Sequence, residues 1–146
     1  MRSLYLGLDT SNYKTSAGLY CPEDGSFRAC GKLLEVPLGS LGLRQSDAVF
    51  AHVKNLPTVM ERLKQELLGK RVLAVGCSTR PRDAEDSYMP CFLAGKAAAE
   101  SFAAALSLPV IPTSHQDGHI MAAVYSCGAG EELLRAPFCA FHVSGG

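Results

Sequence analysis

The chain has 146 residues, of which 47% are hydrophobic and 19% are charged. This length is typical of one domain, and the composition is that of an ordinary globular protein without low-complexity tracts. Fourteen basic and fourteen acidic residues cancel, so no overall field draws nucleic acid or an anionic membrane to the chain, and an RNA partner would need a local patch or another chain. No apolar run approaches the length of a membrane-spanning helix.

The six cysteines show no Cys-x-x-Cys spacing of the kind that binds zinc or forms a redox pair. Their even number is compatible with disulfides. However, the first residues carry one arginine and a short apolar stretch that ends at Asp9, which is the pattern of a strand and not of a secretory signal. We therefore expect reduced thiols and a cytoplasmic protein.

The first third of the chain alternates short apolar segments with turn residues. Strands are expected at 4–8, 15–20 and 28–36, and tight turns between them predict an antiparallel meander. Between residues 49 and 67, apolar side chains recur at steps of three and four, which is the period of a helix with one apolar face. Pro57 should kink or restart this helix, and Gly69 fits its C-terminal cap.

The remainder of the chain alternates strands with helices. Strands are expected at 71–76, 108–111 and 137–143, an alanine-rich helix at 90–107, and a last helix that begins at Thr113 or Ser114 and ends near 127. Three antiparallel strands followed by alternating helices and strands are the ribonuclease-H-like order. The sequence thus predicts an α/β lobe, with a mixed sheet and helices on both of its faces.

The most specific chemical pattern is His115-Gln116-Asp117-Gly118-His119. Histidines four residues apart lie on one face of a helix, so both imidazoles can reach one metal ion. They also lie in the first turn, where the helix dipole favours the neutral ring that a metal requires. In the alternative interpretation, they bind only backbone or water near the helix start.

A third metal ligand is predicted at His142. Alternation along a strand places Phe138, Ala140 and His142 on one face, although a histidine at a sheet edge is an equally simple interpretation. Zinc proteases also place two histidines four residues apart, but they need a glutamate after the first as general base. Here that position is Gln116, which cannot accept a proton, so a metalloprotease is disfavoured.

Two turns are candidates for nucleotide binding. Ser144, Gly145 and Gly146 follow the last expected strand and offer backbone N–H groups with little steric cover, as phosphate-binding turns do. Thr10 and Ser11 follow the first strand, where their hydroxyl groups could hold a phosphate or a metal-bound water. Each turn alone is a weak signal.

Together these segments resemble the tRNA threonylcarbamoyl transferases (Gcp/TsaD), first named O-sialoglycoprotein endopeptidases or glycoproteases. The similarity is carried, in chain order, by Leu-Gly-Leu-Asp-Thr-Ser at 6–11, Leu-Arg-Gln-Ser at 43–46 with His52 and Pro57 after it, the histidine helix from 108 to 120, and His-Val-Ser-Gly-Gly at 142–146. It covers nearly the whole chain. It implies an actin-like ATPase fold of two lobes, of which residues 1–146 would be the N-terminal lobe, with the second lobe outside this chain.

The resemblance also implies a chemistry. Threonylcarbamoyl adenylate would bind between the lobes as an ATP- or AMP-type nucleotide, and a tRNA adenine amine would attack its carbamoyl carbonyl. By this similarity His115 and His119 are ligands of a divalent metal, iron or zinc. His142 falls where some family members place a tyrosine near the metal, and residues 144–146 face the nucleotide.

Two departures from the family suggest a diverged paralogue. The family's Cys-Asp-Glu after the opening Thr-Ser is Asn12-Tyr13-Lys14 here, so an acidic pair is missing. A Gly-Pro-Gly loop is replaced by the charged segment 80–89, expected either as a solvated surface loop or beside the histidine helix, where Arg80 and Arg82 would meet an anionic substrate. The chain is therefore predicted to be either part of a metal-dependent transferase or a non-catalytic paralogue that dimerises with a true transferase.

Overall fold

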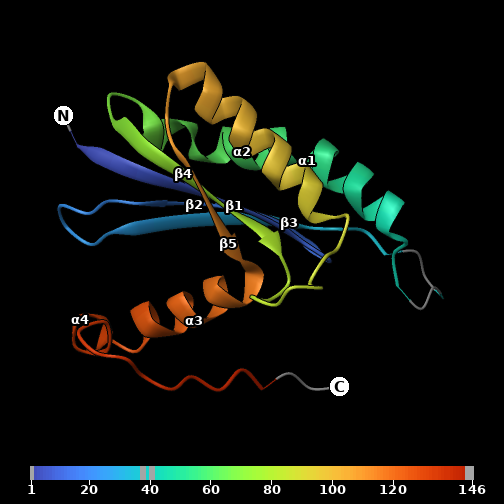
Figure 1. Cartoon of the computed structure of the whole chain (residues 1–146). Coiled ribbons are helices and arrows are strands. Elements are labelled where there is room, and N and C mark those ends of the chain that lie inside the picture. Colours follow the sequence, from blue (N-terminus) through green and yellow to red (C-terminus); the bar gives the residue numbers. More distant parts are fainter. Residues whose placement is uncertain (1, 37–38, 40–41, 144–146) are drawn as a thin grey trace.

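The structure, a computed structural model, describes residues 2–36, 39 and 42–143. Its elements are β1 (Ser3–Ser11), β2 (Lys14–Tyr20), β3 (Phe27–Leu33), α1 (Gln45–Leu67), β4 (Arg71–Arg80), α2 (Phe92–Leu106), β5 (Val110–Ser114), α3 (His115–Ser126) and α4 (Gly130–Leu133). The strands form one sheet in the order β3-β2-β1-β4-β5 (Figure 1). The first three strands are antiparallel, whereas β4 runs parallel to β1 and to β5. The predicted meander and mixed sheet are confirmed.

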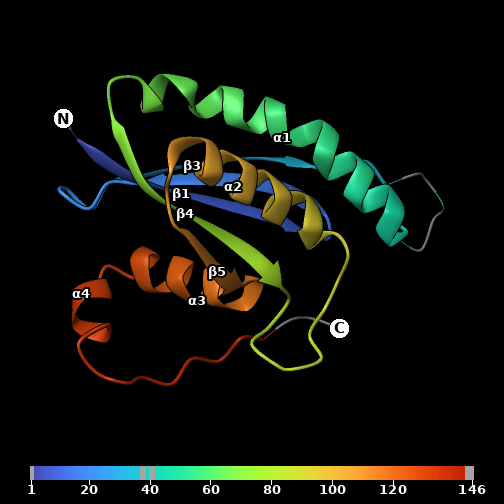
Figure 2. The same cartoon turned by 45° about the horizontal axis from the view of Figure 1, so that its top comes forward.

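The two faces of the sheet follow from the alternation of side chains along each strand. In β1, Leu4, Leu6 and Leu8 are buried in the main hydrophobic core, together with side chains of α1 and α2. Tyr5 and Asp9 point to the opposite face, where Asp9 contacts α3. Figures 1 and 2 show α1 and α2 over one face and α3 beneath the other. The prediction of helices on both faces is therefore confirmed.

Helix α1 runs without a break from Gln45 to Leu67 through Pro57, so the predicted restart at Pro57 is wrong. Proline within a helix removes one hydrogen bond and costs about 3 kcal/mol. Buried apolar residues lie on both sides of it, including Leu56, Val59 and Leu63, so packing against the sheet holds the helix together. Gly69 follows the helix with φ +69°, the left-handed conformation that glycine adopts at helix ends.

The strand predicted at 137–143 is wrong, because this segment is irregular in the structure. A strand is stabilised by hydrogen bonds to a neighbouring strand, and none of the described residues pairs with this segment. Its alternating side chains are therefore left in solvent, with Phe141 92% and Val143 89% exposed. None of the helices among the described residues is long and apolar enough to cross a bilayer.

Close packing of α2 on β1 depends on Gly95. Its N–H donates to the Thr10 hydroxyl at 3.0 Å, and that hydroxyl donates to the Cys91 carbonyl at 2.9 Å. A β-carbon at position 95 would lie 2.8 Å from Thr10 Oγ1. Because both hydrogen bonds hold this hydroxyl in place, it cannot move aside without losing them.

Gly95→Ala should therefore destabilise the protein by about 1–3 kcal/mol, the usual cost of overpacking. Gly118→Ala is the matched control, because Gly118 is also helical but a β-carbon there meets nothing within 4 Å. It should be neutral or stabilising by up to about 1 kcal/mol. Urea unfolding of both variants measures the difference, and equal free energies of unfolding would contradict the packing argument.

Candidate functional site

Helix α3 begins with a capping box that fixes the direction of its first turn. The Ser114 hydroxyl accepts from the Asp117 N–H at 3.1 Å, and the Asp117 carboxylate accepts from the Ser114 N–H at 3.0 Å. The predicted helix start at Ser114 is confirmed. The side chains of His115 and His119 contact Asp9 of the sheet and each other.

The carboxylate of Asp9 links the sheet to this helix. Its Oδ2 atom lies 2.5 Å from Ser78 Oγ and 2.8 Å from His115 Nδ1, while Oδ1 accepts from the Ser11 N–H at 2.8 Å. Asp9 and Ser78 lie toward the carboxyl ends of the parallel neighbours β1 and β4, where ligand sites of α/β proteins commonly form. Sequence analysis did not single out either residue for this role.

The two histidines converge at their outer nitrogens. His115 Nε2 and His119 Nε2 are 2.9 Å apart, and the rings meet edge to face at 4.4 Å between centroids. Two imidazole nitrogens bound to one ion at about 2.0–2.1 Å would lie about 2.9–3.4 Å apart, depending on the coordination angle. The pair therefore fits two adjacent ligands of a single metal.

The third predicted ligand, His142, lies next to this pair but in a different geometry. Its ring stacks on His119, with centroids 5.2 Å apart and planes 18° apart, and its Nδ1 lies 3.5 Å from Gln116 Nε2. Across residues 2–36, 39 and 42–143, no three metal-ligating side chains meet at one point. The structure thus brings all three histidines together and aims two of them at a common position.

The electrostatics of the site favour an ionised carboxylate beside the histidines. Burial would raise the pKa of Asp9, but the hydrogen bonds from His115 and Ser78 outweigh it and hold this pKa at about 2. The hydrogen bond to Asp9 raises the pKa of His115. Burial and the neighbouring imidazoles of His115 and His142 lower the pKa of His119. This favours the neutral ring, whose free lone pair can bind a metal ion.

Two further predicted site residues, Thr10 and Ser11, follow Asp9 in β1. Thr10 is fully buried on the opposite face of the sheet, with its hydroxyl engaged by α2. This placement favours a structural role, and its contact with a nucleotide stays a prediction. Ser11 is half-buried, with its N–H bonded to Asp9. Ser144, Gly145 and Gly146 lie outside the described residues.

The charged segment 80–89 does lie beside the histidine helix. The Pro81 carbonyl accepts from the Gln116 N–H at 3.0 Å, so the segment passes along the first turn of α3. Arg80 forms an ion pair with Asp83, while the Arg82 side chain is exposed. A contact between these arginines and a substrate stays a prediction.

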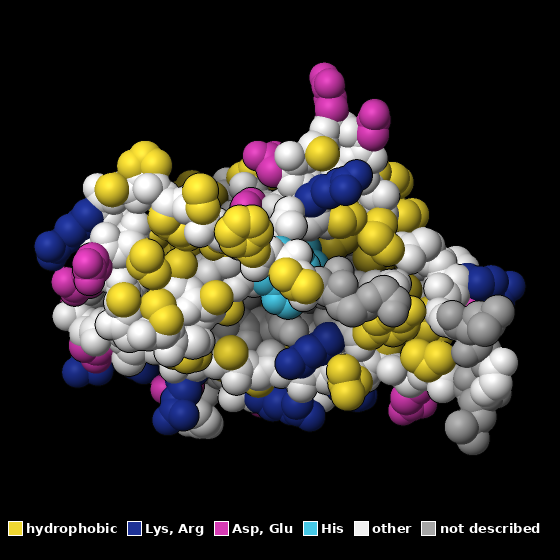
Figure 3. All heavy atoms as spheres, turned by 90° about the horizontal axis from the view of Figure 1, so that it is seen from below, with side chains coloured by type: hydrophobic (Ala, Val, Ile, Leu, Met, Phe, Trp, Pro, Cys, Tyr) yellow, Lys and Arg dark blue, Asp and Glu magenta, His cyan; other side chains and the backbone are white. Residues whose placement is uncertain are grey.

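The histidines are partly covered on the surface. Figure 3 shows histidine side chains near the middle of the lower face, with hydrophobic side chains in front of them.

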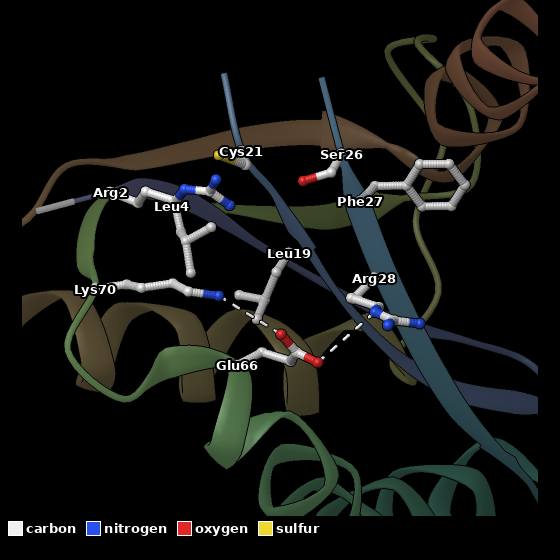
Figure 4. Close-up of a pocket in the computed structure, with 9 residues that line it drawn as sticks. All are labelled: Arg2, Leu4, Leu19, Cys21, Ser26, Phe27, Arg28, Glu66 and Lys70. Carbon is white, nitrogen blue, oxygen red and sulfur yellow. Dashed lines mark ion pairs between the residues drawn. The ribbon is translucent and has the colours of Figure 1, made fainter. Parts of the chain in front are cut away.

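A separate hollow of about 40 Å³ lies at the other end of the sheet, where Glu66 bridges Arg28 and Lys70 at 3.7 and 3.5 Å (Figure 4). That volume suits a few waters at most, so it is no candidate for a nucleotide.

Comparison with known proteins finds a relative of similar sequence. A stretch of 98 residues, 66% of this chain, is 30% identical to the tRNA N6-adenosine threonylcarbamoyltransferase of Magnetococcus marinus. The chain thus resembles this transferase over about two thirds of its own length. The match spans 26% of the length of that relative, and no family model matches the sequence.

Solved structures agree on the fold. YeaZ from Pseudomonas aeruginosa superposes with a TM-score of 0.55 at 20% identity, covering 89% of this chain and 50% of that protein. A second structure, described as an uncharacterized protein with similarity to peptidase YeaZ from the same organism, gives 0.54 at 19% identity, covering 90% of this chain and 49% of that one. The predicted actin-like lobe is therefore confirmed.

His52, which the resemblance also covers, lies away from the other histidines. It is fully buried in α1, and its Nδ1 lies 2.8 Å from the Thr15 hydroxyl, while its Nε2 has no hydrogen-bond partner among the described residues. Burial lowers the pKa of His52. Its position and bonding indicate a structural histidine of the core.

His52 should make the stability of the protein fall in mild acid. Its pKa is lower in the folded state than the ordinary 6.5 of the unfolded chain, so its contribution is complete above pH 6.5 and is lost as the pH falls through its folded pKa. We expect urea unfolding between pH 7.5 and 5 to show a steeper loss of stability for the wild type than for His52→Asn. Parallel curves would show that another group causes the loss.

Proposed function

We propose that this chain is the first lobe of a metal-dependent threonylcarbamoyltransferase-like protein that acts in tRNA threonylcarbamoyladenosine modification. The observation that carries the proposal is the 2.9 Å approach of His115 Nε2 and His119 Nε2, in a sequence related to such transferases. A purely structural lobe has no need of two imidazoles aimed at one point. A second lobe would complete the ligand set and enclose the nucleotide.

Each site residue of this lobe would have a different role. His115 and His119 would hold a divalent iron or zinc ion, which when bound acts as a Lewis acid toward an acyl carbonyl and as a template for the substrate. Asp9 holds the ring of His115 through the 2.8 Å hydrogen bond. Gln116 cannot serve as a general base, which argues against peptide hydrolysis at this site. The amides of residues 144–146 are proposed to bind the phosphate of threonylcarbamoyl adenylate, and a tRNA adenine would be the acceptor.

Removing both histidines should abolish metal binding. For the double variant His115→Ala/His119→Ala, we expect loss of the Zn²⁺ or Fe²⁺ that the wild type is proposed to bind, because no pair of ligands remains. Elemental analysis after dialysis and calorimetric titration measure this, and circular dichroism checks the fold. In the complete two-lobed protein, transfer from threonylcarbamoyl adenylate to tRNA should be lost in parallel.

A matched control removes two exposed carboxylates that could bind metal nonspecifically. Glu131 and Glu132 lie in the short helix α4, and Glu131→Ala/Glu132→Ala should leave the metal content unchanged. Equal metal binding by the wild type and the histidine variant would overturn the proposed site.

A second candidate function, a partner lobe for a paralogous transferase, is favoured by a different observation. An apolar groove of about 450 Å³ lies between α1 and α2. It is lined by Leu6, Leu8, Val53, Leu56, Pro57, Met60, Ala94, Ala97, Ala98, Ser101 and Phe102. Val53 is 54% exposed there. An open apolar surface of this kind is typical of an interface, and another actin-like lobe, a second copy or a paralogue, would fit it.

Introducing a charge into the groove should prevent such association. We expect Ala97→Glu to shift the protein toward monomer in sedimentation equilibrium, because a carboxylate would be buried without a partner. Phe50→Glu is the control, since Phe50 is 66% exposed on α1, the other helix of the groove, but does not line the groove. A wild type that stays monomeric at high concentration, alone and with a paralogous transferase, would contradict the partner role.

A further inference from the structure

We propose that Asp9 is a positioning residue that fixes the tautomer of His115, so that the Nε2 lone pair of His115 faces the metal position shared with His119. Ser78 in turn holds the Asp9 carboxylate in place. This inference rests on the proposed metal site and deepens it, because it assigns a role to two strand residues outside the histidine motif.

The first step is the direction of the hydrogen bond between Asp9 and His115. The carboxylate receives three hydrogen bonds, from Ser78 Oγ, from the Ser11 N–H and from His115 Nδ1. A carboxyl group with the ordinary pKa of aspartate is ionised at neutral pH. An ionised carboxylate can only accept. His115 Nδ1 must therefore carry the hydrogen.

The second step concerns the other ring nitrogen. A neutral imidazole carries one N–H, so a hydrogen on Nδ1 leaves a lone pair on Nε2. His119 Nε2 lies 2.9 Å from this nitrogen, a separation at which both atoms can bind one ion. A carboxylate bonded to the far nitrogen of a metal-binding histidine is a common arrangement, which orients the ring and increases its basicity.

The third step is the rigidity of the support. Leu8 pairs with Cys77 in the parallel register of β1 and β4, which places Asp9 beside Ser78 at the ends of two neighbouring strands. Ser78 is only 5% exposed, so its hydroxyl is held close to the carboxylate. The Phe92 ring lies 6.2 Å from the ring of His115 and limits its rotation. The sheet, and not helix α3 alone, thus sets the orientation of His115.

Two measurements on the protein test this role. The ring ¹⁵N shifts of His115, recorded without metal at a pH where the imidazole is neutral, should show hydrogen on Nδ1 in the wild type and mainly on Nε2 in Asp9→Ala. Zn²⁺ affinity, from titration against a competing chelator, should fall about 10–100-fold in Asp9→Ala and Asp9→Asn, as is usual when such a supporting group is lost. Asp9→Asn keeps the size of the side chain, so it separates the charge from the packing.

Ser78→Ala should lower Zn²⁺ affinity in the same direction by a smaller factor. Ser16→Ala is its matched control, because Ser16 pairs with Asp9 from the other neighbouring strand and is half-buried, whereas Ser78 is buried. It should leave affinity and tautomer unchanged. A wild type that binds no Zn²⁺ refutes the proposed metal site. A wild type that binds it, with Asp9 variants that keep both its affinity and its tautomer, refutes the role of Asp9 alone.

Discussion

The hydrogen bonds that meet at the Asp9 carboxylate are the constraint on which the candidate site depends. They join β1 to β4 through Ser78 and join both strands to α3 through His115. The residues concerned are 69 and 106 positions apart from Asp9 in the sequence. Because one carboxylate fixes all of them, the position of the histidine pair is set by the framework of the sheet.

The two faces of the sheet have different roles, one in the hydrophobic core and the other in the candidate site. On the face toward α1 and α2, every second residue of β1 is buried, and even its last polar member, Thr10, has its hydroxyl bonded to α2. On the other face, Asp9 meets a helix that begins with histidine. Adjacent residues of one strand therefore serve different purposes. A polar residue near the end of a strand therefore indicates a site only when it lies on the face of the sheet that does not pack against the hydrophobic core.

The relation to the threonylcarbamoyltransferases is consistent with this division. The sequence of the histidine helix resembles that of the family, whereas Asn12, Tyr13 and Lys14 stand where the resemblance implies an acidic pair. The charged segment after β4 runs along the same helix, with the Pro81 carbonyl bonded to the N–H of Gln116.

The sequence alone determined features that depend on local physics. These are the meander, the helix begun by Ser114, the apolar stripe of α1 and the two histidines on one helical face, each readable from period, turn residues or a cap. Tertiary structure decided which distant groups meet. Alternation predicted a strand at 137–143, but a strand needs a partner, and no described residue provides one. Likewise, the sequence near Asp9 does not predict its contact with His115. That contact arises only when the parallel strands bring their carboxyl ends together next to the first turn of α3.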